Sequence, residues 1–370
     1  MAEIPKVAFR VDSSLVIGAG HVMRCLMLAQ ELRAAGTQCH FICADLPGHL
    51  GDLIRTSGMS LTLLPAPNQG LSVPHDYDTW SGIPWKDDAQ LSADALSSQS
   101  FQWLVVDHYG LDVRWEAQAM YSQGLADAGC LVMDDLANRS HLATVLVDTG
   151  LSRLAADYVA HVPPACQLLL GPKYAVLRPD FAVMRPSVLP TRNARLLQNV
   201  LIAMGGVDLQ NSTAAVLDCM NQLSLPSDLN VTVVLGGTAP HLSSVKAQAE
   251  GLSFACEVVA DVPDMHRLMS EADLAIGAVG GTAWERCVVG LPSLMLSIAE
   301  NQIPAARALS DAGAAIYLGS LEEPGWQAIL ETALEKMREP GALAALACAS
   351  STLCDGRGVE RLVEVIRDMS

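Results

Sequence analysis

The sequence predicts an α/β protein with two Rossmann-like domains, each built on a doubly wound parallel sheet. The length of 370 residues suits two ordinary domains. Short apolar runs rich in β-branched residues alternate with helical patterns, which is typical of βαβ units. The same alternation starts again near Asn199, after a segment that contains two prolines. We therefore expect two such domains in tandem, with a ligand in the cleft between them at the carboxyl ends of both sheets.

The first half of the chain contains six predicted strands with helical patterns between them. Helices are predicted over residues 21–35, which end before Gly36, and over residues 48–57. Proline, glycine and aspartate are frequent in residues 65–84, so this stretch predicts a loop at one end of the sheet. The predicted strands are residues 7–10, 38–43, 60–64, 103–107, 131–133 and 144–147.

The second half repeats this pattern, and glycines follow three of its four predicted strands. The fourth strand, residues 293–296, precedes a helix that begins at about Asn301. The other three strands and the glycines that follow them are 200–203 with Gly205-Gly206, 231–235 with Gly236-Gly237, and 274–276 with Gly280-Gly281.

We expect the first domain at residues 1–187, a linker at about 188–195 and the second domain at residues 196–370. The linker is placed by the prolines and polar residues of 185–195, because interior prolines interrupt helices. The last helical pattern, residues 359–367, can pack on either domain.

The composition excludes several classes of protein. The net charge of −17 argues against nucleic acid or an anionic membrane as a partner, because no basic surface is available. No apolar run approaches the roughly 18–20 residues of a membrane span, and the N-terminus lacks the pattern of a secretory signal. The ten cysteines are scattered without a CxxC pair. This favours free, buried thiols in a cytoplasmic protein over disulfides or a zinc site.

The most informative motif is Gly18-Ala-Gly20-His21, with Arg24 three residues later. It places a histidine where a glycine-containing loop becomes a helix, and backbone N–H groups at such a point favour an anion. The positive end of a helix disfavours an imidazolium, so His21 is expected to stay neutral, the form that a general base needs.

Each residue around this motif also has an alternative interpretation. Arg24 binds an anionic substrate group or forms a salt bridge at the sheet edge. Asp12 and Ser13 orient His21, bind substrate hydroxyls, or form a turn. The glycines themselves could belong to a dinucleotide fingerprint with Asp45 on the ribose, but Met23 replaces the third glycine and the motif lies well past the strand. A purely structural His21 is disfavoured, since an imidazole at an open helix end gains little from packing.

Two further groups of polar residues lie at the ends of predicted strands in the first half. Asp107-His108-Tyr109 follows the strand at 103–107, where α/β enzymes place functional side chains. Asp134-Asp135 follows the next strand. Because neighbouring side chains on a strand point to opposite faces, these two carboxylates are expected to form separate hydrogen bonds instead of sharing a metal ion.

The glycine loops of the second half predict a phosphate site. Glycines let backbone N–H groups approach a phosphate, and the hydroxyl of Thr282 can add a donor. Glu285, one turn into the following helix, can accept hydrogen bonds from two ribose hydroxyls. The candidate binding residues of this half are Gly205, Gly206, Gly280, Gly281, Thr282, Glu285, Glu300, Asn301 and Gln302.

Together these motifs resemble the UDP-sugar hydrolases of pseudaminic acid biosynthesis, a group with a GT-B-like fold. The N-terminal signature is residues 9–14 and 18–24, and the resemblance extends in the same order over residues 6–310. Val207 departs from the polar residue expected after the paired glycines. The later signatures are Asp107-His108-Tyr109-Gly110, Asp134-Asp135, Met204-Gly205-Gly206 and Glu300-Asn301-Gln302.

The resemblance implies hydrolysis of UDP-2,4-diacetamido-2,4,6-trideoxy-β-L-altropyranose to UDP and the free sugar, with inversion at C1. It implies no metal and no cofactor. His21 would be the general base, Asn301 would hold the substrate near the phosphates, and residues 280–285 would hold UDP.

Three other functions fit parts of the sequence. A GT-B glycosyltransferase would use an acceptor other than water but the same UDP site. A non-catalytic UDP-sugar-binding protein would bind without turnover, and a dinucleotide oxidoreductase would bind nicotinamide.

Overall fold

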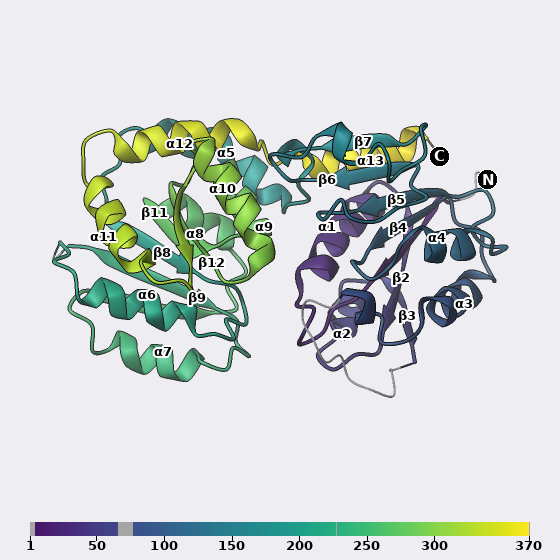
Figure 1. Cartoon of the computed structure of the whole chain (residues 1–370), viewed down its shortest axis with the longest axis horizontal. Coiled ribbons are helices and arrows are strands. Elements are labelled where there is room, and N and C mark those ends of the chain that lie inside the picture. Colours follow the sequence, from purple (N-terminus) through teal and green to yellow (C-terminus); the bar gives the residue numbers. More distant parts are fainter. Residues whose placement is uncertain (1–3, 66–76, 227, 370) are drawn as a thin grey trace. The chain divides into compact units, whose positions relative to one another are not determined.

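The computed structural model describes residues 4–65, 77–226 and 228–369. The chain forms two compact units. Unit 1 consists of Met1–Val176 together with Arg357–Ser370, and unit 2 consists of Leu177–Gly356. Each unit is a Rossmann-like α/β layer structure with its own parallel sheet (Figure 1).

Unit 1 is built on a seven-stranded parallel sheet of order β3-β2-β1-β4-β5-β6-β7. The chain returns to the middle of the sheet between β3 and β4, so β1 and β4 are neighbours. This reversal is the position where open α/β sheets bind ligands, at the carboxyl ends of the strands. The strands are β1 (Lys6–Val11), β2 (Gln38–Ala44), β3 (Ser60–Leu64), β4 (Trp103–Asp107), β5 (Gly129–Met133), β6 (Val145–Asp148) and β7 (Gln167–Leu170).

Alternating side chains of the strands pack on two helical layers in unit 1. Val7 and Phe9 of β1 belong to the core beneath α1 (Gly20–Ala34), α2 (Gly51–Thr56) and α13 (Gly358–Asp368). Ala8 belongs to the opposite core, beneath α3 (Trp85–Leu96) and α4 (Val113–Met120). Figure 1 shows these two helical layers on either side of the sheet. The near-continuous apolar sequence of β1 and β4 follows from this burial on both faces.

Unit 2 repeats the architecture with six parallel strands in the order β10-β9-β8-β11-β12-β13. Here β8 and β11 are the neighbours at the reversal. The strands are β8 (Asn199–Ala203), β9 (Asn230–Leu235), β10 (Ala255–Ala260), β11 (Leu274–Ala278), β12 (Ser293–Ser297) and β13 (Ile316–Ser320). The helices are α5 (Pro179–Arg192), α6 (Ser212–Asn221), α7 (Leu242–Ala249), α8 (Met265–Glu271), α9 (Gly281–Val288), α10 (Ile303–Asp311), α11 (Trp326–Lys336) and α12 (Ala342–Leu353).

The expected linker at 188–195 is mostly helical, because α5 continues to Arg192 through Pro186 and Pro190. Both prolines are exposed, whereas Phe181 and Val188 on the same helix are buried. Packing of α5 against α8, α9 and α12 therefore outweighs the helix-breaking tendency of the prolines.

The strands that the sequence did not predict are edge strands. β7 ends the first sheet, and β10 and β13 end the second. These three strands are paired on one side only and are less buried than the central strands, so burial imposes a weaker pattern on their sequences. The predicted helix at 48–57 is shorter than expected and spans Gly51–Thr56. Of the loop expected at 65–84, residues 66–76 lie outside the described residues, and Tyr77–Thr79 forms a turn of 3₁₀-helix.

All ten cysteines are free thiols, and five that lie within apolar runs of the sequence are buried: Cys39, Cys43, Cys130, Cys219 and Cys287. In the part of the chain that the structure describes, no helix is both long and apolar enough to span a membrane.

Candidate functional site

His21 lies in the first turn of α1, at the carboxyl end of the sheet of unit 1. The chain reaches this helix through Gly18, whose φ of +81° is the left-handed conformation that favours glycine. The Ser14 hydroxyl accepts hydrogen bonds from the N–H groups of Val16 and Ile17 and closes the preceding turn. Gly18 and Gly20 have open space where a side chain would be, and α1 has no side-chain cap. The loop and helix start therefore match the sequence prediction.

Asp107, the last residue of β4, orients His21. The His21 Nδ1 lies 2.6 Å from Asp107 Oδ1. When Nδ1 donates its proton to this carboxylate, Nε2 is left as the acceptor nitrogen. The His21 residue is 9% exposed. This is the arrangement of a general base whose tautomer is fixed by a buried carboxylate.

Arg24 completes this pair from the next turn of α1. Its Nε and one terminal nitrogen donate to Asp107 at 2.5 and 2.6 Å, and the other terminal nitrogen donates to Asp135 at 2.9 Å. Burial alone would raise the pKa of Asp107, but the Arg24 guanidinium and then His21 outweigh it and lower that pKa. Asp107 is therefore a permanent anion beside His21. Of the two alternatives for Arg24, the structure has the salt bridge.

Two aromatic rings, Tyr109 and Trp80, lie beside the imidazole, and a third packs on both of them. Tyr109 meets the His21 ring edge to face at 4.7 Å, and its hydroxyl donates to Asp135 at 2.8 Å. Trp80 stacks on Tyr109 with ring centres 5.4 Å apart, and Tyr77 contacts both rings. Burial, then Asp135, raises the pKa of Tyr109, so this hydroxyl remains a donor. The sequence prediction included Tyr109 but not Tyr77 or Trp80, because aromatic residues in a loop carry no periodic signal.

Asp12 does not contact His21, in contrast to one expected role. It is buried and accepts hydrogen bonds from Arg10 at 2.6 Å and from the N–H of Ala44 at 2.7 Å. The Nε2 of His108 lies 3.1 Å from the other Asp12 oxygen, and His108 Nδ1 accepts from the N–H of Gly110. Burial raises the pKa of Asp12, but Arg10 and His108 outweigh this and lower it.

Ser13 and His108 are likewise used inside unit 1. The Ser13 hydroxyl accepts a hydrogen bond from Leu50 N–H. His108 is 2% exposed, and burial lowers its pKa more than Asp12 raises it. All three side chains, Asp12 included, are buried and present no polar group at the surface. They therefore hold the loops that support His21.

Asp134 and Asp135 take part in separate interactions, as their strand position predicts. Asp134 is buried with Arg139 and the Tyr158 hydroxyl, at 2.9 Å each. Asp135 faces Arg24 and Tyr109. Among the described residues, no group of three or more His, Cys, Asp or Glu side chains could hold a metal ion.

In unit 2 the predicted loops come together at one edge. They follow β8, β11 and β12, which are adjacent parallel strands, so all three loops lie at the carboxyl ends of the sheet. Gly280 precedes α9, and a Cβ at Gly280 or Gly281 would meet no protein atom within 4 Å. In the described part of the chain, the N–H groups of Gly281 and Thr282 have neither a side-chain cap nor a backbone acceptor. Such a helix start is suited to an anion.

The Gly205-Gly206 loop differs from this in one respect. Asp208 accepts hydrogen bonds from the N–H groups of Ser212 and Thr213, both at 2.9 Å. The first turn of α6 is therefore capped by a carboxylate of the protein, which the sequence prediction did not anticipate. Gly205, with φ of +114°, and Gly206 still offer open backbone.

The remaining predicted residues of unit 2 have distinct positions. Glu285 lies one turn into α9, and burial raises the pKa of its carboxyl more than Arg178 and Arg286 lower it. Glu300 and Asn301 are exposed after β12, whereas the Gln302 side chain accepts from Ile298 N–H at 3.1 Å. Gln302 thus holds the loop that presents its two neighbours.

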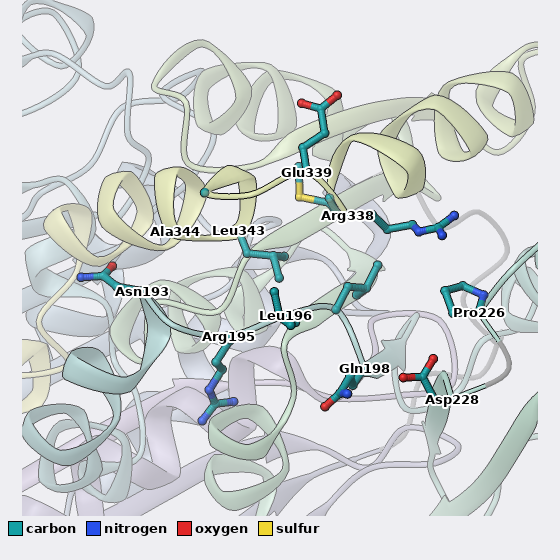
Figure 2. A pocket seen from close by; sticks show the side chains of 13 residues that line it. Asn193, Arg195, Leu196, Gln198, Pro226, Asp228, Arg338, Glu339, Leu343 and Ala344 are labelled. Carbon is teal, nitrogen blue, oxygen red and sulfur yellow. The ribbon is translucent and has the colours of Figure 1, made fainter.

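A cavity of about 210 Å³ lies elsewhere on unit 2. Gln198 and Asp228, which line it, precede β8 and β9, so the cavity is at the amino edge of the sheet, opposite the predicted loops. Figure 2 shows Arg195 and Arg338 among the polar side chains around it. It includes none of the predicted site residues.

The chain matches one family model in unit 2 and several known proteins. Residues 199–353, which lie in unit 2, match the glycosyltransferase family 28 C-terminal domain. The chain is 26% identical over 271 residues to a UDP-2,4-diacetamido-2,4,6-trideoxy-beta-L-altropyranose hydrolase of Campylobacter jejuni. The aligned residues cover 73% of this chain and 84% of that protein. It is 30% identical over 199 residues to the spore coat polysaccharide biosynthesis protein SpsG of Bacillus subtilis.

The match to SpsG covers 54% of this chain, and the chain spans 58% of the length of that relative. Among solved structures, MurG of Acinetobacter baumannii is similar over 98% of this chain and 99% of its own, with a TM-score of 0.71 and 15% identity. At that identity the likeness shows the fold. The chain thus has a GT-B-like fold of two Rossmann-like units and resembles the UDP-2,4-diacetamido-2,4,6-trideoxy-β-L-altropyranose hydrolase in sequence.

Proposed function

We propose that this protein hydrolyses UDP-2,4-diacetamido-2,4,6-trideoxy-β-L-altropyranose to UDP and the free sugar in the cytoplasm. The reaction is a step of pseudaminic acid biosynthesis, which supplies sugar for flagellin glycosylation. Water attacks C1 of the sugar, the C1–O bond to UDP breaks with inversion, and UDP leaves with the bonding electron pair. The resemblance in sequence supports the choice of substrate.

The observation that carries the proposal is the His21–Asp107 pair at 2.6 Å. His21 Nε2 accepts the proton of the attacking water while Asp107 stabilises the imidazolium that forms. A positioned base of this kind contributes roughly 10²- to 10⁴-fold to the rate. His21 is the catalytic residue in this proposal, and Arg24 holds Asp107 in place.

Unit 2 binds UDP in this proposal. The open N–H groups at the start of α9 bind the diphosphate and stabilise the charge that develops on it, so neither a metal ion nor a cofactor is needed. The Glu285 carboxyl accepts hydrogen bonds from the ribose hydroxyls, and Asn301 holds the substrate near the phosphates. The loops at Gly205 and Glu300 add contacts from the same sheet edge.

A second candidate is a GT-B glycosyltransferase with an amino-sugar donor and an acceptor other than water. The fold of MurG and the match of residues 199–353 favour it, and the same histidine–aspartate pair can activate an acceptor hydroxyl. The two candidates differ in one result, which is whether UDP and free sugar form without an acceptor.

The test is proton NMR of the purified chain with the UDP-diacetamido sugar, with and without EDTA. Hydrolysis predicts UDP and inverted free sugar in both samples. His21→Ala should lower kcat by about 10²-fold or more while UDP affinity stays within a few-fold. The control is His40→Gln, because His40 lies on β2 and contacts Thr62. Release of UDP only when an acceptor is added would favour the glycosyltransferase, and an unchanged kcat in His21→Ala would remove His21 as the base.

A further inference from the structure

Arg286 in α9 is a buried arginine that lacks most of its hydrogen-bond acceptors. It is 1% exposed, and one terminal nitrogen donates to the carbonyl of Ala278 at 2.9 Å. Its Nε and its other terminal nitrogen are buried without an acceptor. Unsatisfied buried donors are uncommon in folded proteins, and an uncompensated buried charge is costly. This residue therefore needs an explanation other than packing.

Two other arginines of unit 2, the buried Arg192 and the half-buried Arg185, show the ordinary structural arrangement. Arg192 donates to the carbonyls of Met269, Ala272 and Val289. Arg185 donates to three carbonyls as well, from Val288, Ser351 and Cys354. Through these hydrogen bonds the two guanidinium groups hold α5 against the segments that surround it. Among the described residues, Arg286 is the arginine whose buried nitrogens remain without acceptors.

The Arg286 guanidinium lies directly behind the open glycine loop. Its contact with the Ala278 carbonyl places it at the end of β11, two residues before Gly280. A Cβ at Gly277 would lie 2.2 Å from a terminal nitrogen of Arg286, so the absence of a side chain at Gly277 makes room for this group. Side chains of a helix point towards its N-terminus, which brings Arg286 from the second turn of α9 back to this loop.

The charge of Arg286 has no ion-pair partner within 4 Å among the described residues. Burial lowers its pKa to about 10, with Cys287 and then Glu285 acting in the opposite direction. The guanidinium is therefore still charged at neutral pH. Glu285 is the nearby carboxyl that favours this charged form. A cation in a low-dielectric environment acts over a longer distance than one in water.

On the basis of the proposed function, we propose that Arg286 is the buried counter-charge of the UDP diphosphate and sets the affinity of unit 2 for that group. It acts through the glycine loop without touching the ligand, and adds its charge to the N–H groups of Gly281 and Thr282. The diphosphate in turn compensates a charge that the protein otherwise leaves unpaired. Arg286 is thus a positioning and affinity residue for phosphate, and it has no role in binding the uridine.

The experiment is titration calorimetry of the full chain with UDP and with uridine, which lacks the phosphates. We expect Arg286→Met to weaken UDP binding about tenfold or more, as loss of a nearby charge predicts, while uridine affinity stays within twofold. Arg286→Lys should recover part of the UDP affinity. Arg338→Met is the control for net charge, because Arg338 is exposed beside the cavity at the opposite edge of the sheet (Figure 2).

Thermal unfolding of the same variants separates this role from a structural one. Removing an unpaired buried charge should leave the melting temperature of Arg286→Met unchanged or higher. If UDP and uridine weaken equally, or UDP binds Arg286→Met as it binds the wild type, the proposal is wrong. A wild type that binds UDP without hydrolysing it would contradict the proposed hydrolysis and leave the Arg286 proposal standing. A wild type that binds no UDP would overturn both.

Discussion

At the scale of single residues, the base and the carboxylate beside it come from distant parts of the sequence. His21 lies in the first turn of α1, and Asp107 ends β4, a strand that pairs with β1. The pairing of these strands brings the two side chains together at the reversal in strand order. Arg24 fixes the carboxylate by two hydrogen bonds, so Asp107 has little freedom to turn away from the imidazole.

Replacement of Asp107 by Asn should therefore lower kcat strongly. The amide cannot hold the Nδ1 proton as the carboxylate does, so the tautomer with a basic Nε2 is no longer favoured. We expect a loss of about 10²-fold or more in kcat, with KM within a few-fold. Asp135→Asn is the control, since Asp135 contacts Arg24 and Tyr109 but not His21. Equal losses in the two variants would contradict a specific role for Asp107.

A second prediction at this scale concerns the glycine loop of unit 2. Gly281 lies in α9 with open space around its missing side chain, so Gly281→Ala should fold with an unchanged melting temperature. The added methyl would occupy the space where a phosphate approaches the backbone. We expect UDP affinity to fall about tenfold, the effect of one lost charge-assisted hydrogen bond. Gly251→Ala, after the end of α7, is the matched control, and calorimetry measures both.

At the scale of secondary-structure elements, a buried ion network joins α3 to the sheet of unit 1. Arg10 of β1 donates to both oxygens of Asp88 in α3, at 2.6 and 3.0 Å. Asp88 also accepts from the indole N–H of Trp115 in α4 at 2.8 Å. Arg10 also donates to Asp12 at 2.6 Å, so the network holds the end of β1 in place.

Breaking this network should cost much more than removing a surface charge. Asp88→Ala leaves the Arg10 guanidinium buried with fewer partners, and we expect the free energy of unfolding to fall by about 3–5 kcal/mol. The neighbouring Asp87 is exposed, so Asp87→Ala should change it by no more than about 0.5 kcal/mol. Urea denaturation followed by circular dichroism measures both, and similar values for the two variants would argue against the network.

At the scale of the whole molecule, the chain returns to unit 1 at its C-terminal end. α13 packs on α1 and on the 3₁₀ turn Pro172–Tyr174, and the Trp103 indole donates to the Ile366 carbonyl at 3.0 Å. Val359, Leu362 and Ile366 are buried in the same core as the strands of unit 1. The helix that carries His21 is thus covered by the last helix of the chain.

Stability of unit 1 should therefore depend on this terminal helix. Leu362→Ala removes a fully buried side chain from the core, and we expect a loss of about 2–5 kcal/mol in unfolding free energy. Glu364→Ala in the same helix changes an exposed residue and is the control. Denaturation in urea, with activity measured in parallel, tests this. A Leu362→Ala variant as stable as the control would show that α13 is dispensable.

Much of the fold and part of the site follow from the sequence. The central strand 103–107 is buried on both faces and has the bounds that its apolar run predicts, because burial on both sides requires apolar residues throughout. The bounds of the edge strand 60–64 are predicted as well. The edge strands β7, β10 and β13 and the helix α5 are not predicted, since their stability comes from neighbours far along the chain. The glycine loops and the start of α1 are predictable because positive φ and open backbone require glycine.

The sequence by itself determined the two α/β units, the helix that presents His21 and the glycine loops after β8 and β11. Only the tertiary structure decided the partners: Asp107 and not Asp12 orients His21, Asp208 caps α6, and Arg286 lies behind the loop at Gly280. The physical reason is that local pattern fixes which elements form. Strand order, which depends on packing across the whole sheet, fixes which of their ends meet.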